Sequence, residues 1–105
     1  MPLVKVASRS QLPPGALAEA KVGETTLVLC HAQGEIHALD GLCPHREGPL
    51  AHGALHENWI VCPWHAWEFD CLTGSNDYRP EIKLRKFAVV EDGDDILVEV
   101  PESSA

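Results

Sequence analysis

Basic residues are scarce in this sequence. Its 105 residues include eight lysines and arginines against sixteen aspartates and glutamates, which gives a formal net charge of −8 at pH 7. Such a charge repels phosphate groups, so it excludes nucleic acids and anionic membranes as expected partners. It favours instead a protein whose partners present basic surfaces.

Long apolar runs are missing as well. No segment approaches the roughly 18 apolar residues that a membrane-spanning helix needs. The first five residues, MPLVK, do not begin an apolar signal region. We therefore expect a soluble, cytoplasmic protein with no membrane partner.

Cysteine and aromatic residues are few. Three tryptophans, two phenylalanines and one tyrosine allow only thin aromatic packing. Of the four cysteines, Cys30 lies in an apolar run and Cys71 follows a predicted strand. A disulfide between these two is conceivable, but a reducing cytoplasm disfavours it. We therefore expect both to pack as small apolar side chains.

Turn residues, by contrast, are abundant. Eight prolines and eight glycines imply many turns, and 45% hydrophobic residues suffice for one modest core. Between the turns, short segments alternate apolar and polar residues or are rich in β-branched residues. The predicted strands are residues 4–6, 17–22, 25–30, 35–39, 59–61, 66–70, 84–90 and 96–100. This pattern predicts an all-β sandwich or barrel in a single domain, 1–105, without a helix.

Two connections have clear turn chemistry, and one segment has no pattern. Gln33-Gly34 predicts a hairpin turn, and residues 91–95 predict a hairpin loop with Gly93 at its tip. Residues 46–58 are polar and dotted with glycine, and they show no sustained period. We expect irregular structure there.

Two short motifs combine cysteine with histidine. They are Cys43-x-His45 and Cys62-x-x-His65, with 16 residues between His45 and Cys62, and a proline follows the cysteine in both. Each motif predicts a tight loop that offers one thiolate and one imidazole. Two such loops supply two thiolates and two imidazoles, which together form a metal-binding set.

Zinc is one candidate for this set. Structural zinc sites use the same residue types but usually group Cys with Cys and His with His. Here each loop supplies one of each, which suits two bridged metal ions, one held by both thiolates and the other by both imidazoles. In a Rieske 2Fe–2S cluster, two histidines replace two cysteines on one of the irons.

The two motifs closely resemble those of the Rieske family, and the specific part of the resemblance lies in residues 43–74. The resemblance implies the Rieske fold, an antiparallel β-sandwich base with an inserted cluster-binding subdomain, here at about 40–72. It also implies one 2Fe–2S cluster per chain. Thiolates would hold the inner iron and imidazoles the outer iron, through the ligands Cys43, Cys62, His45 and His65.

Departures from the respiratory Rieske proteins indicate the type of ferredoxin. Those proteins carry an extra cysteine in each loop, joined as a disulfide, where this chain has Gly48 and Trp64. They also carry a serine and a tyrosine whose hydroxyls bond a cluster sulfur and a cysteine sulfur, where this chain has Trp67 and Phe69. Hydrogen bonds to sulfur raise the potential. The resemblance is therefore to the low-potential ferredoxins of bacterial oxygenase systems.

The remaining histidines and the acidic residues near the loops have separate interpretations. Since the cluster already has its ligands, we expect a structural or solvated role for His31, His37, His52 and His56. Four acidic residues lie close to the loops in sequence, and we expect them to help the tip dock on basic partner surfaces. They are Asp40, Glu47, Glu68 and Asp70.

The predicted function is electron transport without catalysis. The resemblance implies a carrier that accepts one electron from a flavin-dependent ferredoxin reductase and passes it to a terminal oxygenase. An oxygenase subunit would add a catalytic domain with a two-His-one-carboxylate iron site, for which 105 residues leave no room. Two alternatives remain open: a small subunit or accessory domain of an assimilatory nitrite reductase, and a zinc-binding interaction module.

Overall fold

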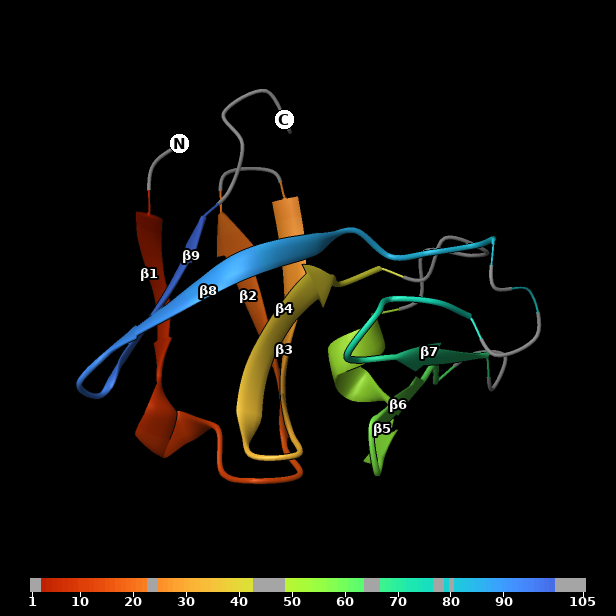
Figure 1. Cartoon of the computed structure of the whole chain (residues 1–105), viewed down its shortest axis with the longest axis horizontal. Coiled ribbons are helices and arrows are strands. Elements are labelled where there is room, and N and C mark those ends of the chain that lie inside the picture. The colour runs from red at the N-terminus through yellow and green to blue at the C-terminus, as the bar shows by residue number, and fades with distance from the viewer. Residues whose placement is uncertain are drawn as a thin grey trace.

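Nine strands form two antiparallel sheets in the computed structural model, which describes residues 3–22, 25–42, 49–63, 67–76, 79 and 81–99. The larger sheet has six strands in the order β1-β9-β8-β4-β3-β2, and the smaller has three in the order β5-β6-β7. Figure 1 shows the small sheet beside the large one. The strands are β1 Leu3–Ser8, β2 Leu17–Val22, β3 Thr25–Ala32, β4 Glu35–Asp40, β5 Ala54–His56, β6 Trp59–Val61, β7 Glu68–Asp70, β8 Lys86–Asp92 and β9 Asp95–Glu99.

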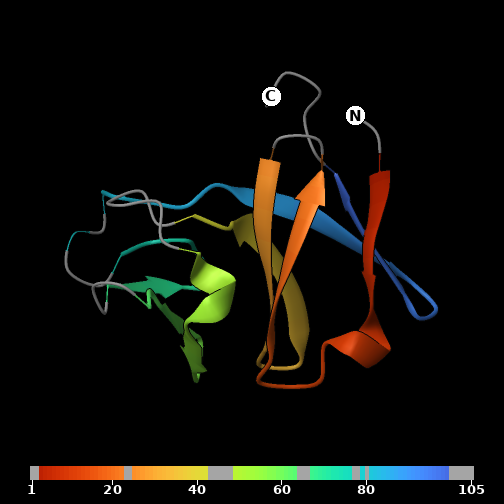
Figure 2. The same ribbon diagram turned by 180° about the vertical axis from the view of Figure 1, so that it is seen from behind.

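The small sheet is inserted between two neighbouring strands of the large one. The chain leaves β4, forms β5, β6 and β7, and returns to pair with β4 as β8. At the other side of the large sheet, the edge strands β1 and β2 contact each other, so this sheet is nearly closed. Figure 2 shows both edge strands from behind. The prediction of an all-β, antiparallel base is confirmed.

Strand β3 forms a wall shared by two hydrophobic cores. Alternation sends Leu27 and Leu29 into a core within the large sheet, with Phe87, Ile96 and other buried residues. It sends Val28 and Cys30 into a second core, between the two sheets. For this reason the last six residues of β3 are all buried. Each fully buried leucine contributes roughly 1.5–3 kcal/mol, so β3 anchors both halves of the molecule.

One hairpin turn forms as the sequence predicts, and a second differs in length from its prediction. Gln33 and Gly34 both have positive φ, 52° and 79°, the backbone that a two-residue hairpin turn needs. The β8–β9 hairpin forms with Gly93 in its turn, as predicted, but the turn is shorter than residues 91–95, because Asp92 pairs with Asp95 and only Gly93 and Asp94 lie between the strands. The prediction missed this because the last residues of β8 are exposed and acidic, and such residues are typical of a loop.

Three short elements were not predicted. They are the 3-10 helices η1, Arg9–Gln11, and η2, Leu50–His52, and strand β5. Each has three residues, which is too short to show a period. The return strand was predicted from residue 84, but Leu84 pairs its backbone N–H with Gly74 and the strand begins at Lys86. The extended connection expected at residues 77–80 lies largely outside the described residues.

The described elements are all short. No helix in the described part of the chain is long and apolar enough to cross a membrane.

Candidate metal centre

The first ligand loop is closed at its base by backbone contacts. Residues 43–48, which include Cys43 and His45, lie outside the described residues. On either side, Leu42 and Pro49 form an antiparallel bridge, and the N–H of Leu50 donates to the carbonyl of Gly41 over 2.9 Å. The chain therefore leaves and returns at one point.

Glycine is required at the start of this loop. The N–H of Gly41 donates to the carbonyl of Thr26 over 2.9 Å. A Cβ at Gly41 would lie 2.7 Å from the carbonyl carbon of Leu27, closer than side chains approach backbone. The loop thus begins directly against β3, and the sequence analysis had no signal for this contact.

The second ligand loop is closed in the same way. Strand β6 ends at Val61, and the N–H of Cys62 donates to the carbonyl of Trp67 over 2.7 Å. His65 lies between these residues and outside the described ones, which resume at Trp67. Short strands on both sides, β6 and β7, pair with each other and hold the two ends of the loop together.

Close packing brings the segment after the first loop against the second. Gly53 follows η2, and a Cβ there would lie 1.8 Å from the carbonyl oxygen of Val61 and 3.2 Å from Cδ of Pro63. Leu50 and Cys62 are both buried in the core between the sheets. Both loops therefore start from one packed core, which fixes the spacing between their bases.

Cys62 has the surroundings of an iron–sulfur ligand. Its side chain is 1% exposed, and among the described cysteines it is the one outside a disulfide. A buried thiol at the base of a closed loop fits a thiolate bound to an inner metal ion. Two cysteines and two histidines on two such loops form the donor set of a Rieske cluster.

The other histidines have roles apart from the loops. His31 is buried and donates from Nδ1 to the carbonyl of Leu12 over 2.9 Å, which confirms a structural role. His52 is exposed, with Nε2 4.0 Å from a carboxylate oxygen of Glu19, and His56 is exposed on β5. Within the described ranges, no three His, Cys, Asp or Glu side chains form a group that could hold a metal ion.

Two of the acidic residues expected at a docking tip make hydrogen bonds that hold the fold. Asp40 accepts hydrogen bonds from the backbone N–H and the guanidinium of Arg85, with Nη2 3.1 Å from Oδ1. This pair raises the pKa of Arg85 above its usual value, through the hydrogen bond to Asp40 and then its charge. Asp70 accepts from Nδ2 of Asn58 and from the N–H of Leu72. Sequence analysis assigned these acids to docking because they lie close to the ligand loops in sequence.

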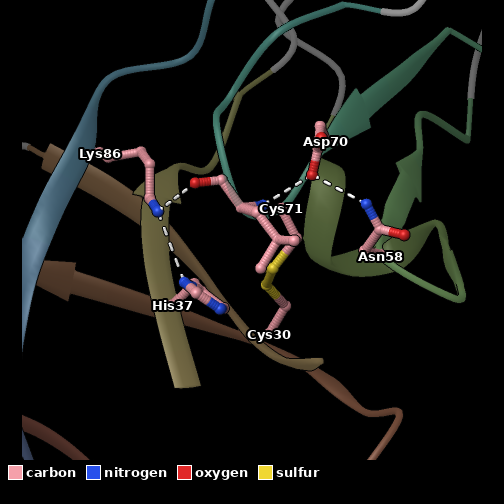
Figure 3. The surroundings of a disulfide bond; sticks show 7 residues. Cys30, His37, Asn58, Asp70, Cys71 and Lys86 are labelled. Carbon is pink, nitrogen blue, oxygen red and sulfur yellow. Dashed lines mark hydrogen bonds between the residues drawn. A yellow bond between two sulfur atoms is a disulfide. The ribbon is translucent and has the colours of Figure 1, made fainter. Parts of the chain in front are cut away.

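The expectation of two free thiols at Cys30 and Cys71 is wrong in this structure. The two residues form a disulfide, with 6.9 Å between their Cα atoms (Figure 3). Cys30 faces the core between the sheets from β3, and Cys71 reaches the same core from the turn after β7. The prediction rested on the redox state of the expected compartment, and the sequence gives no sign that Cys30 and Cys71 lie close together in the fold.

Comparison with known proteins identifies the metal cofactor of this chain. The family described as the Rieske [2Fe-2S] domain matches residues 3–90. The chain belongs to this family. It is an all-β Rieske protein that carries one 2Fe–2S cluster, and the zinc alternative is set aside.

The Rieske protein is similar to ferredoxin components over nearly its whole length. It is 32% identical over 101 residues to the biphenyl 2,3-dioxygenase ferredoxin component of Rhodococcus jostii (strain RHA1), covering 95% of this chain and 94% of the relative. It is 30% identical to the alkene monooxygenase system ferredoxin component of Xanthobacter autotrophicus, over 90% of this chain and 79% of the relative. It is thus an electron-transfer ferredoxin of the type found in bacterial oxygenase systems, not a catalytic subunit.

Solved structures of ferredoxins have the same fold as this chain. The ferredoxin of carbazole 1,9a-dioxygenase from Nocardioides aromaticivorans IC177 superimposes with a TM-score of 0.84 at 32% identity, over 93% of this chain and 97% of that one. A ferredoxin solved in a complex with oxygenase, also of carbazole 1,9a-dioxygenase, gives 0.82 at 26% identity, over 91% of each chain.

We expect the cluster of this ferredoxin to have a midpoint potential below zero, and the variant Phe69→Tyr to raise it. Phe69 is fully buried on β7, with its ring centroid 6.4 Å from that of Trp67, and neither side chain has a hydroxyl. A tyrosine hydroxyl that reaches a sulfur withdraws electron density and favours the reduced cluster. Protein-film voltammetry of both proteins measures the shift. A wild-type midpoint near the upper end of the Rieske range, about +300 mV, would contradict the expectation.

Proposed function

We propose that this ferredoxin accepts one electron from a flavin-dependent ferredoxin reductase and passes it to a terminal oxygenase, in the cytoplasm. The observation that carries the proposal is the full-length similarity to ferredoxin components of oxygenase systems. The carbazole 1,9a-dioxygenase ferredoxin, of the same fold, has been solved together with its oxygenase. The reductase is the counterpart that a ferredoxin component requires.

The ligands we propose for the cluster are the four motif residues. Cys43 and Cys62 bind the inner iron as thiolates, and His45 and His65 bind the outer iron through imidazole nitrogens. The burial of Cys62 supports an inner position for its iron. We propose residues 1–105 as one Rieske domain and residues 40–72 as its cluster-binding subdomain.

The protein's own residues position and insulate the redox group. When bound, the cluster supplies reversible one-electron transfer. The core between the sheets, with Leu50, Ile60 and Phe69 fully buried, excludes water from the inner side of the loops. Imidazole ligands from His45 and His65 would bring the redox group near a docked partner, which would shorten the path of the electron.

Stopped-flow mixing tests this proposal and its electrostatics together. The oxidised ferredoxin is mixed with the reduced reductase, and the reduced ferredoxin with a terminal oxygenase, while the visible absorbance of the cluster is followed. We expect one electron per chain in each step, and a bimolecular rate of reduction that falls as salt rises. The chain carries twice as many acidic as basic side chains, and steered association weakens with ionic strength.

Two charge-neutralising variants form a matched pair for this measurement. Glu57 is exposed in the turn between β5 and β6, whereas Asp92 is exposed in the β8–β9 hairpin at the far end of the molecule (Figure 1). Docking through the loops predicts a larger loss of rate for Glu57→Gln than for Asp92→Asn. A rate that is flat across the salt series would leave solubility as the role of the charge. Failure of the oxygenase to reoxidise the ferredoxin would contradict the proposed function.

A further inference from the structure

The disulfide Cys30–Cys71 ties the two sheets together around the ligand loops. Cys30 belongs to β3 of the large sheet, and Cys71 is the residue directly after β7 of the small sheet. Their sequence separation of 41 residues encloses both Cys/His motifs. Both side chains are fully buried. The bond is therefore a covalent connection between the base and the segment that binds the cluster.

His37 and Lys86 lie next to each other, beside this disulfide. His37 is directly opposite Cys30 in the register of β3 and β4, so the two side chains share one face of the sheet. Nζ of Lys86 lies 3.5 Å from Nδ1 of His37 and donates to the carbonyl of Leu72, the residue after Cys71. Figure 3 shows the lysine ammonium between the ring and this carbonyl, with the disulfide beside them.

One nitrogen of His37 has a proton and nothing to donate it to. A lysine ammonium can only donate, so Nδ1 of His37 accepts and the ring proton lies on Nε2. Burial and then the charge of Lys86 lower the pKa of His37 from its usual value, which favours the neutral ring. Nε2 is buried and has no hydrogen-bond partner among the described residues. An unmatched buried donor is a cost that the fold bears in the disulfide form.

Opening the disulfide would supply the missing acceptor. A disulfide sulfur accepts hydrogen bonds poorly, whereas a thiolate is a strong acceptor next to an N–H and an ammonium. The Cys30 side chain is the neighbour of His37 across the strand pair, and the carbonyl that Lys86 binds belongs to the residue next to Cys71. Both groups therefore favour the reduced pair over the disulfide.

We propose that Cys30 and Cys71 form a reversible thiol–disulfide site, whose reduced form is stabilised by His37 and Lys86. The co-reactant is a dithiol. It gives two electrons: the Cys30–Cys71 bond breaks to a Cys30 thiolate and a Cys71 thiol, the dithiol closes its own disulfide, and the second of its two protons goes to solvent. Stabilising the reduced form makes a disulfide more oxidising. Because both sulfurs are buried, exchange requires local opening and is slow, while His37 sets the position of the equilibrium.

An anaerobic redox titration of the intact holoprotein tests this site. The protein is equilibrated with mixtures of reduced and oxidised dithiothreitol, quenched in acid, freed of released iron and sulfide, and alkylated under denaturing conditions. Intact mass then counts the reacted cysteines. We expect two in oxidising mixtures, from Cys43 and Cys62, and four in reducing ones, with a single two-electron midpoint.

Variants at His37 distinguish a reversible thiol–disulfide site from a disulfide with only a structural role. His37→Phe removes the donor, and we expect reduction to become about tenfold less favourable, which is about 30 mV for a two-electron couple. His37→Gln keeps a donor and should fall between this variant and wild type. Lys86→Met provides a second route if His37→Phe does not fold, with a shift in the same direction. Lys83→Met, at an exposed lysine in the return segment, is the control and should leave the midpoint unchanged.

Three results would overturn the proposal. Four reacted cysteines at every ratio would show that the bond does not form in the holoprotein. Two at every ratio would show a permanent disulfide. A midpoint that stays at the wild-type value in His37→Phe and Lys86→Met would show that neither group acts on the pair.

Discussion

Replacing Cys62 with serine or His65 with alanine should abolish assembly of the 2Fe–2S cluster. We expect iron and acid-labile sulfide to fall from two of each per chain to near zero, together with loss of the red-brown colour and of the Rieske electron paramagnetic resonance signal after reduction. Cys62 is buried at the closed base of its loop, so no solvent ligand can replace its thiolate there. Elemental analysis and spectroscopy of freshly purified protein measure the loss.

Histidines away from the loops are the controls. His37→Ala and His52→Ala should keep the full iron content, because His52 is exposed and His37 faces the disulfide rather than a ligand loop. A native spectrum in His65→Ala would show that the ligand assignment is wrong. Stoichiometric zinc without iron in protein made under iron-replete conditions would contradict the assignment of the cofactor itself.

The variant Gly53→Ala should unfold the cluster-binding sheet. Its new Cβ would lie 1.8 Å from the carbonyl oxygen of Val61, so β5 and β6 cannot keep their pairing. Overpacking in a tight core costs about 1–3 kcal/mol, and a collision with backbone has no flexible side chain to relieve it. We therefore expect a loss of about 3 kcal/mol or more in the free energy of unfolding, with reduced iron content.

A second glycine distinguishes collision from backbone strain. Gly93 has a φ of 63°, and a Cβ there would meet nothing within 4 Å. Gly93→Ala should lower the free energy of unfolding by only about 1–2 kcal/mol, the strain of a non-glycine residue in the left-handed region, and should leave the iron content intact. Denaturant unfolding followed by circular dichroism, with iron analysis of the folded protein, compares the two. Equal losses in both variants would contradict a collision at Gly53.

The sequence predicted what depends on neighbouring residues. The segments between turn residues located β2 and β6 with their observed bounds, and Gln33-Gly34 located the β3–β4 turn. The Cys/His motifs could be recognised because a ligand loop is a local feature with fixed spacing. The family match then established the cofactor that these motifs had implied.

Contacts between distant residues could not be predicted in this way. Asp40 and Arg85 are 45 residues apart, and Asn58 reaches Asp70 across two strands. Cys30 and Cys71 meet only because β3 and the turn after β7 face one core. One-dimensional patterns carry no signal for such pairs, so two of these acids were assigned to the surface and the two cysteines to separate positions.

The contact between Asp40 and Arg85 determines which part of this kind of ferredoxin can vary in length. These residues join the point where the chain leaves the large sheet to the point where it returns, through a side-chain ion pair and backbone hydrogen bonds. Everything between them is, for the large sheet, one loop with fixed ends. The entropy of closing a flexible loop grows only with the logarithm of its length. Insertions and deletions in this segment can therefore reshape the surface that meets a partner, while the six-stranded sheet keeps its register.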